Sequence, residues 1–188
     1  MQLKDLVFIS AMATLMAVIT DLLYPIAVII GGPILGPSLV HHALFAIPLA
    51  LILSIVHCKV PHKWTYSIFS LIWGFLMFVR LGNPIPIVGF WSAGIVSDSF
   101  ALLFRFFKVD KKRFFLSLQS GIFLFSLGMF MSVLFGIFLG SVGQKLILKN
   151  IGLFAIVILI PASITAASGY LLNPIVVELK NIGLLDNV

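Results

Sequence analysis

The sequence contains little charge and almost no cysteine. Only 10% of the 188 residues are charged, whereas 61% are hydrophobic. A soluble domain of this length cannot bury so much apolar surface, so the bilayer must be the solvent for most side chains. Because Cys58 is the only cysteine, the chain forms no internal disulfide and has none of the cysteine-rich metal spacings.

Several signatures of catalysis are also missing. The sequence has no His-Glu-x-x-His pair, no Gly-x-Ser-x-Gly elbow and no glycine-rich phosphate loop ending in Lys-Ser/Thr. Adjacent histidines on a helix, such as His41 and His42, point about 100° apart, so one ion is not expected to bind both. We therefore expect a chain that is not an enzyme and that carries no metal and no cofactor.

Long apolar stretches, by contrast, are abundant. A membrane helix needs roughly 20 residues at about 1.5 Å each, and six stretches predict such helices: residues 6–24, 38–57, 64–80, 86–107, 114–140 and 151–172. The predicted fold is an all-α integral membrane protein, a single domain 1–188 formed by a compact bundle of six transmembrane helices. Residues 175–188 are predicted to be a short cytoplasmic tail, either an amphipathic helix on the membrane or unstructured.

The positive charges lie between these stretches and predict the orientation. The connections on one side hold nine of the twelve Lys and Arg residues, and those on the other side hold Arg80, Lys145 and Lys149. Positive loops face the cytoplasm, so both termini are predicted to lie there. Because the charges follow the connections, the net charge of +6 is interpreted as a topology signal and no nucleic-acid partner is expected.

Small residues recur at every fourth position in several predicted helices, where they allow helix backbones to approach closely. The clearest stripe ends residues 114–140, and shorter ones occupy other helices: Gly128, Ser132, Gly136 and Gly140; Gly89, Ala93 and Ser97; Ala162 and Ala166; Ser10, Ala13 and Ala17. Packing within the chain is the expected role of most of them.

The segment from Tyr24 to Pro37 is uncharged and carries three prolines and three glycines. Glycine and proline interrupt regular structure, whereas the Ile and Val side chains of this segment avoid water. We therefore predict a loop that folds back over the bundle.

Asp98 lies about twelve residues into the predicted helix 86–107, near or below the membrane centre. A carboxylate costs about 3 kcal/mol there on insertion scales, so it should face the interior. Two interpretations stay open. Asp98 binds a polar or cationic group of a ligand, or it is neutral or bonded to a hydroxyl of Ser97, Ser99 or a neighbouring helix.

Further polar and aromatic residues are predicted near the outer surface: Asp21, Tyr24, His41, Arg80, Asn83 and Trp91. Polar groups mixed with aromatic rings under an apolar loop are typical of a small-molecule pocket. Interfacial anchoring is the alternative for each of them, since Trp, Tyr and Arg are common at membrane surfaces.

Six short spans in fewer than 200 residues, with Ala13-x-x-x-Ala17 in the first helix and a long apolar loop after it, resemble the substrate-binding (S) components of energy-coupling factor (ECF) transporters. The run Lys59-Val-Pro-His-Lys63, then Gly74, Gly82 and Trp91, and a basic loop after the fourth helix resemble the small S components first grouped from streptococci and treponemes.

This resemblance implies a substrate-capture subunit in the plasma membrane of a prokaryote. It would bind a vitamin, a precursor or another micronutrient from outside and work with a membrane scaffold subunit and two cytoplasmic ATPases. The family's docking surface for the scaffold corresponds to Ala13 and Ala17, with Ser10 on nearly the same face. Its gate corresponds to the loop around Gly31, Gly32 and Pro33. Gln2 replaces the N-terminal histidine of the nickel and cobalt branch, which disfavours a metal substrate.

Two other classes of function stay open. One is a membrane-embedded enzyme that acts on a lipid or prenyl substrate with Asp98 as its acid, and the other is a membrane assembly protein.

Overall fold

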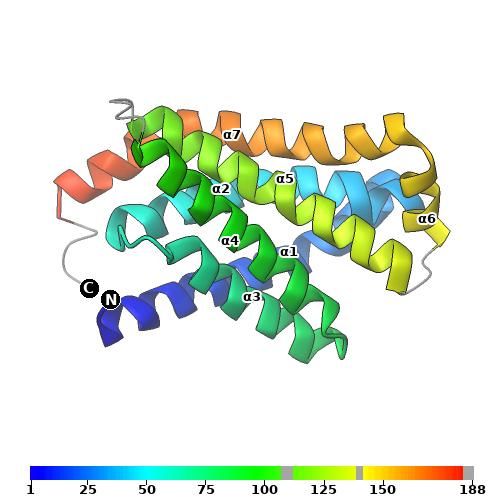
Figure 1. The fold of residues 1–188 in the computed structure, drawn as a ribbon, viewed down its shortest axis with the longest axis horizontal. Coiled ribbons are helices and arrows are strands. Elements are labelled where there is room, and N and C mark those ends of the chain that lie inside the picture. The colour runs from blue at the N-terminus through cyan, green and yellow to red at the C-terminus, as the bar shows by residue number, and fades with distance from the viewer. Residues whose placement is uncertain (107–111, 139–141, 184–188) are drawn as a thin grey trace.

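The computed structural model describes residues 1–106, 112–138 and 142–183, and every regular element in these ranges is a helix (Figure 1). The elements are α1 (Leu3–Leu35), the π-helical turn η1 (Gly36–Val40), α2 (His41–Lys59), α3 (Thr65–Leu81), α4 (Ile85–Phe106), α5 (Lys112–Phe138), α6 (Val142–Lys149) and α7 (Ile151–Asn181). The predicted all-α class is confirmed.

Five helices in the described part of the chain are long and apolar enough to cross a membrane, judged by length and composition. They cover Leu3–Gly32, His41–Lys59, Ile85–Leu103, Leu116–Leu134 and Ile151–Leu179. The sixth predicted span corresponds to α3, a shorter apolar helix of 17 residues. The helices are those of a multi-pass membrane protein.

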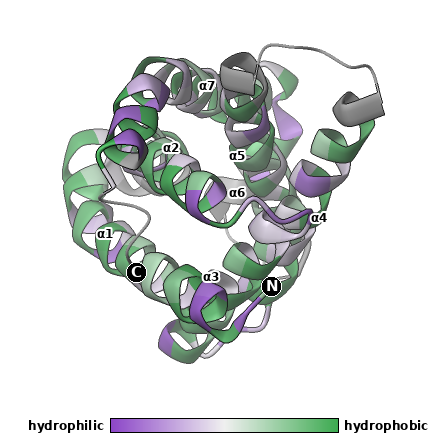
Figure 2. Cartoon of the chain, turned by 90° about the vertical axis from the view of Figure 1, so that its left-hand side faces the viewer, coloured by the Kyte–Doolittle hydropathy of each residue, from purple (hydrophilic) through white to green (hydrophobic). Residues whose placement is uncertain are grey.

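The five long helices and α3 form a closed ring in the order α1, α2, α7, α5, α4, α3 and back to α1, and α2 also contacts α5 across it. Figure 2 shows this ring end-on, with hydrophobic residues predominating along the helices. Aromatic side chains of α2, α3, α4 and α5 fill its centre, and the largest fully buried ones are Phe45, Tyr66, Phe69, Trp73 and Phe123.

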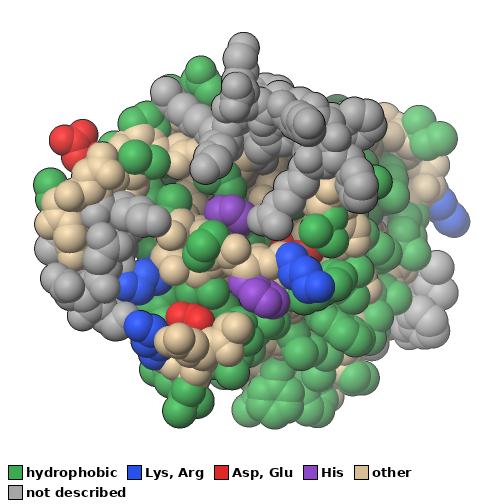
Figure 3. All heavy atoms as spheres, turned by 60° about the vertical axis from the view of Figure 1, so that its left-hand side comes forward, with side chains coloured by type: hydrophobic (Ala, Val, Ile, Leu, Met, Phe, Trp, Pro, Cys, Tyr) green, Lys and Arg blue, Asp and Glu red, His purple; other side chains and the backbone are tan. Residues whose placement is uncertain are grey.

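The start of α1 and the end of α7 lie at one end of this bundle, and α6 lies at the other (Figure 1). Histidine and positively charged side chains are visible at the end that carries the termini (Figure 3). α6 was not expected from the sequence. It covers the opposite end with Ile147 fully buried, while Lys145 and Lys149 are exposed.

The segment predicted as a loop from Tyr24 to Pro37 is helical instead. α1 continues through Pro25 and is broken only at Gly32, where φ is 67° and ψ is −174°. Backbone groups in lipid must find hydrogen bonds within their own segment, so an apolar sequence stays helical despite its prolines. The chain then folds back closely, because a Cβ at Gly36 would lie 2.7 Å from the Ala27 carbonyl oxygen.

The predicted tail 175–188 is also helical over most of its described length. α7 passes through Pro174 and ends at Asn181. Asn173 and Val176 are both buried, so this part of α7 packs on the bundle. Residues 184–188 lie outside the described part of the chain.

Small residues lie at close contacts between helices, but these contacts are not at the longest stripe, which begins at Gly128. α5 lies close to α7 at Gly121, where a Cβ would lie 2.8 Å from the Ala166 Cβ, whereas at Gly128 the nearest atom would be 3.6 Å away. Gly140 lies outside the described residues. On α4, a Cβ at Gly89 would lie 2.5 Å from the Met131 sulfur of α5, and the Ser97 hydroxyl donates to the Gln119 carbonyl at 2.9 Å.

Candidate functional site

Asp98 belongs to α4, and its carboxylate contacts the N-terminal end of α3. Its Oδ2 accepts hydrogen bonds from the backbone N–H and the hydroxyl of Ser67, both at 2.7 Å, and its Oδ1 accepts from the backbone N–H of Tyr66 at 3.3 Å. The first N–H groups of a helix have no partner within the helix, and Trp64 provides no side-chain cap here. A residue of α4 therefore caps α3.

The close contact of α3 with α4 explains how Asp98 reaches this position. A Cβ at Gly94, one turn before Asp98, would lie 2.7 Å from the Tyr66 carbonyl oxygen and 2.8 Å from the Ser67 Cα. The absence of a side chain at Gly94 therefore lets α4 lie directly on the first turn of α3. These contacts match the interpretation of Asp98 as bonded to a neighbouring helix, with Ser67 as the partner.

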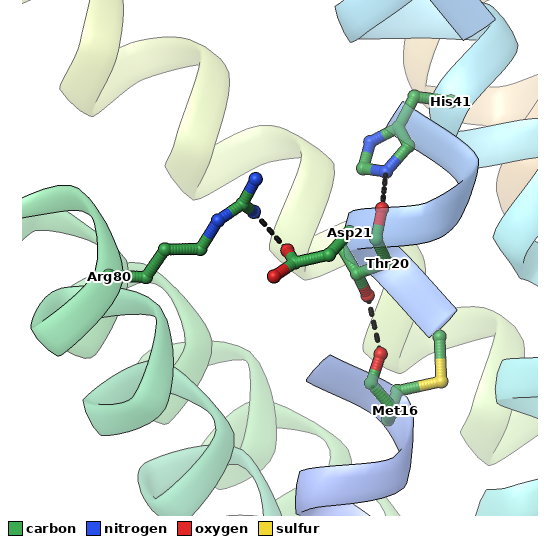
Figure 4. A network of polar contacts seen from close by, with 5 residues as sticks. All are labelled: Met16, Thr20, Asp21, His41 and Arg80. Atoms are coloured by element: carbon green, nitrogen blue, oxygen red, sulfur yellow. Dashed lines mark hydrogen bonds and ion pairs between the residues drawn. The ribbon is translucent and has the colours of Figure 1, made fainter. Parts of the chain in front are cut away.

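A second polar cluster lies at the other end of α3. Arg80 in the last turn of α3 forms an ion pair with Asp21 of α1, and their side chains are 43% and 37% exposed (Figure 4). The 13 residues from Ser67 to Arg80 span about 20 Å of helix. The predicted pocket residues are therefore divided between the two ends of α3, and Asp98 does not join the others.

His41, the first residue of α2, joins this cluster. It is buried, and its Nε2 lies 3.0 Å from the Thr20 carbonyl oxygen of α1 (Figure 4). Because a carbonyl oxygen only accepts hydrogen bonds, Nε2 must carry the proton. Tyr24, one turn beyond Thr20, places its ring edge-on to that of His41 at 5.5 Å. Three helices, α1, α2 and α3, thus meet at this cluster.

The two remaining predicted pocket residues, Asn83 and Trp91, have other surroundings. The Asn83 Oδ1 accepts a hydrogen bond from the Ile85 N–H at 3.0 Å and so caps the start of α4. Trp91 is 46% exposed on the outside of α4. Interfacial anchoring, the alternative named for both residues, stays a prediction.

The predicted docking residues of α1 do not share one exposed face. Ala13 is fully buried in the core of its own chain, so it offers no surface to a partner in this arrangement. Ala17 and Ser10 are half-buried, and the Ser10 hydroxyl donates to the Leu6 carbonyl at 2.8 Å. The exposed side of α1 instead carries apolar residues at helical spacing: Leu3, Val7, Ala11, Val18, Leu22 and Ile29.

The three residues predicted as a gate lie at the break in α1. A Cβ at Gly31 would lie 2.7 Å from the Gly36 nitrogen, and Gly32 adopts the positive φ. The side chain of Pro33 is outside the described part of the chain. These glycines let η1 pack against the end of α1.

Sequence reasoning missed the aromatic residues at the bundle centre. Tyr66 and Trp73 are fully buried, and neither the Tyr66 hydroxyl nor the Trp73 ring N–H has a hydrogen-bond partner among the described residues. The spacing of Tyr66, Phe69 and Trp73 could have indicated this buried face, because positions i, i+3 and i+7 lie on one side of a helix. Among the described residues no three His, Cys, Asp or Glu side chains are grouped to hold a metal ion.

Comparisons of the chain with models of known protein families, with curated proteins and with solved structures gave no match.

Proposed function

We propose that this protein is the membrane-embedded substrate-capture subunit of an ATP-driven micronutrient uptake transporter. In this proposal six helices cross the plasma membrane of a prokaryote, both termini are cytoplasmic, and a vitamin or a precursor binds from outside. A scaffold subunit and two cytoplasmic ATPases are the partners, since the chain itself has no phosphate-binding loop.

The observation that supports capture from one side is the cluster of Asp21, Arg80 and His41. It lies where α1, α2 and α3 meet and is partly open to solvent. Ligand sites are often concave and mostly apolar, with a few polar groups that fix orientation. A charged pair and a buried imidazole next to aromatic rings have this composition.

The polar contacts of Asp98 give no comparable support to the enzyme alternative. Both of its oxygens already accept hydrogen bonds from the start of α3. An acid that transfers a proton to a lipid substrate needs an oxygen that can reach that substrate.

Docking on the scaffold would use the exposed side of α1. Association of helices within lipid depends on close van der Waals packing, which small residues favour. Ala11 is the small exposed residue in the middle of this face, between Val7 and Leu15. It replaces the buried Ala13 as the position where a partner helix can approach.

The test is co-purification of the tagged chain from its host membrane with two ATP-hydrolysing subunits. Ala11→Trp should abolish co-purification and leave the melting temperature unchanged, because the added ring points outward. Ala167→Trp, at an exposed alanine of α7, is the matched control and should retain the partners. Ala13→Trp should instead lower the melting temperature, since overpacking a buried site costs about 1–3 kcal/mol or more.

Absence of ATPases from the wild-type preparation would overturn the transport role. If the complex forms but Ala11→Trp leaves it intact, then only the assignment of the docking face fails.

A further inference from the structure

A continuous series of aromatic rings runs through the interior of the bundle. The rings belong to α1, α2, α3 and α5, and neighbouring centroids lie between 5.0 and 6.4 Å apart. In order they are Tyr24, His41, Phe45, Trp73, Phe123, Tyr66 and His57. The series begins beside the polar cluster of Asp21 and Arg80 and ends near the first turn of α3.

Two polar groups in the middle of this series lack a hydrogen-bond acceptor among the described residues. They are the hydroxyl of Tyr66 and the ring N–H of Trp73, and both side chains are fully buried. A buried donor without an acceptor is costly, and nearly all such groups in folded proteins are paired. Two of them on one face of α3 therefore require an explanation.

Phe123 of α5 contacts the rings that carry both donors. Its ring centroid is 6.4 Å from that of Trp73, with the planes inclined by only 13°, and 6.2 Å from that of Tyr66. A flat aromatic ring thus already lies nearly parallel to the indole, in contact with both rings that carry an unused donor. An aromatic ligand with acceptor atoms would make the same stacking contacts and would also satisfy the donors.

We propose that Tyr66, Trp73 and Phe123 form the binding site of a small, planar, uncharged molecule that carries hydrogen-bond acceptors. The Tyr66 hydroxyl and the Trp73 N–H donate to the bound molecule, and the Phe123 ring moves aside and covers it. This inference deepens the proposed function and rests on it, because it names the class of compound that the subunit captures.

The surroundings of Trp73 favour an uncharged molecule next to the indole. The other rings that contact Trp73 belong to Phe45, Phe69 and Phe90. None of these side chains can neutralise a charge, and an unpaired charge in such surroundings is strongly disfavoured. The ring series also suggests the route of entry, from Tyr24, which is 42% exposed, past His41 and Phe45 to Trp73.

Fluorescence of Trp73 provides the test on the purified full-length chain in detergent. Trp64→Phe and Trp91→Phe leave Trp73 as the only tryptophan, because the chain has three. Three planar, neutral probes with acceptor atoms are titrated: quinoxaline, thymine and nicotinamide. We expect saturable quenching by at least one of them, and naphthalene, which has the shape of quinoxaline without its acceptor nitrogens, should not compete with it.

Variants of the donors separate this site from general stacking. Tyr66→Phe keeps the ring and removes the hydroxyl, so it should weaken binding about tenfold, the effect of one hydrogen bond. Tyr170→Phe makes the same chemical change at an exposed position and should bind as the parent does. In the absence of probe, Tyr66→Phe should keep or raise the melting temperature, since it removes a buried hydroxyl that lacks an acceptor.

Three results would overturn the proposal: no saturable quenching by any probe, equal binding by Tyr66→Phe and its parent, or a lower melting temperature of probe-free Tyr66→Phe. These outcomes can be told apart from a failure of the transport role. Quenching without ATPase co-purification leaves the binding site standing and rejects the transporter, whereas ATPase co-purification without quenching rejects the site alone.

Discussion

At the scale of single residues, several polar side chains inside this bundle bind backbone groups of other helices, while others such as Ser54 and Thr165 bond a carbonyl of their own helix. Asp98 of α4 caps α3, Ser97 binds a carbonyl of α5, and the Ser117 hydroxyl of α5 donates to the Ala166 carbonyl of α7. Side chains that hydrogen-bond across helices are one of the forces that hold membrane bundles together. These residues are therefore first of all contacts between helices.

Replacement of Asp98 should reveal this role as a loss of stability. Asp98→Ala leaves two N–H groups and one hydroxyl without their acceptor, and each orphaned group costs roughly 1–3 kcal/mol. Asp98→Asn keeps one acceptor oxygen and should lose less. Unfolding of the purified protein in detergent measures both, with the exposed Ser99→Ala on the same helix as the control. Equal melting temperatures for Asp98→Ala and Ser99→Ala would contradict the capping role.

Residue types alone predicted part of the candidate site. An acid in an apolar helix must face inward and find a partner, and Asp98 does both. The sequence did not specify its partner, because Ser67 comes within reach only through the contact of Gly94 with α3. Asp21 and Arg80 were expected near each other, but their pairing also depends on how α1 packs on α3.

At the scale of elements, the break in α1 determines how the chain enters α2. Gly32 combines φ of 67° with ψ of −174°, a backbone conformation that is essentially restricted to glycine. Apart from its chain neighbours and the nearby backbone of its own helix, no described atom lies within 4 Å of a Cβ built there. Backbone strain alone, without a steric clash, therefore penalises a side chain at this position.

Gly32→Ala should lower the free energy of unfolding by about 1–3 kcal/mol, the cost of one residue held in a sparsely populated conformation. Gly152→Ala is the matched control in the first turn of α7, where alanine should be neutral or stabilising by about 0.5–1 kcal/mol. Thermal unfolding of the two variants compares them directly. A Gly32→Ala protein as stable as the parent would mean that the break can be rebuilt without positive φ.

The existence of the long helices was predictable from the sequence, whereas the short helix α6 and the ends of α1 and α7 were not. Apolar length predicted all the long helices, because lipid demands internal backbone hydrogen bonds. The same demand carries α1 through Pro25 and α7 through Pro174, where residue preferences known from water predicted interruptions. The lipid surroundings therefore explain why α1 and α7 extend beyond the ends that residue preferences predicted.

At the scale of the whole molecule, the closed ring places both ends of the chain together. Starting from α1, the order is α2, α7, α5, α4 and α3, so the first and last helices of the chain are separated only by α2. Small-residue stripes indicate that a helix has close neighbours, but not which ones. The ring order was therefore beyond sequence reasoning.

The proposed orientation is testable with single cysteines. In a Cys58→Ser background, Gln2→Cys and Lys149→Cys place thiols at exposed positions at opposite ends of the bundle. A maleimide that does not cross membranes should label Lys149→Cys on intact cells and Gln2→Cys only after permeabilisation, because the basic connections favour the cytoplasm. The opposite labelling pattern would reverse the orientation, and labelling of both on intact cells would contradict an arrangement across the membrane.

The cap that Asp98 provides also constrains how the chain is made. During synthesis α3 leaves the ribosome before α4, so its first N–H groups reach the insertion machinery before the side chain of Asp98 does. A 17-residue helix with bare N–H groups is a poor candidate for independent release into lipid. α3 and α4 are therefore best inserted together as a hairpin, and the buried acid completes that step when it arrives.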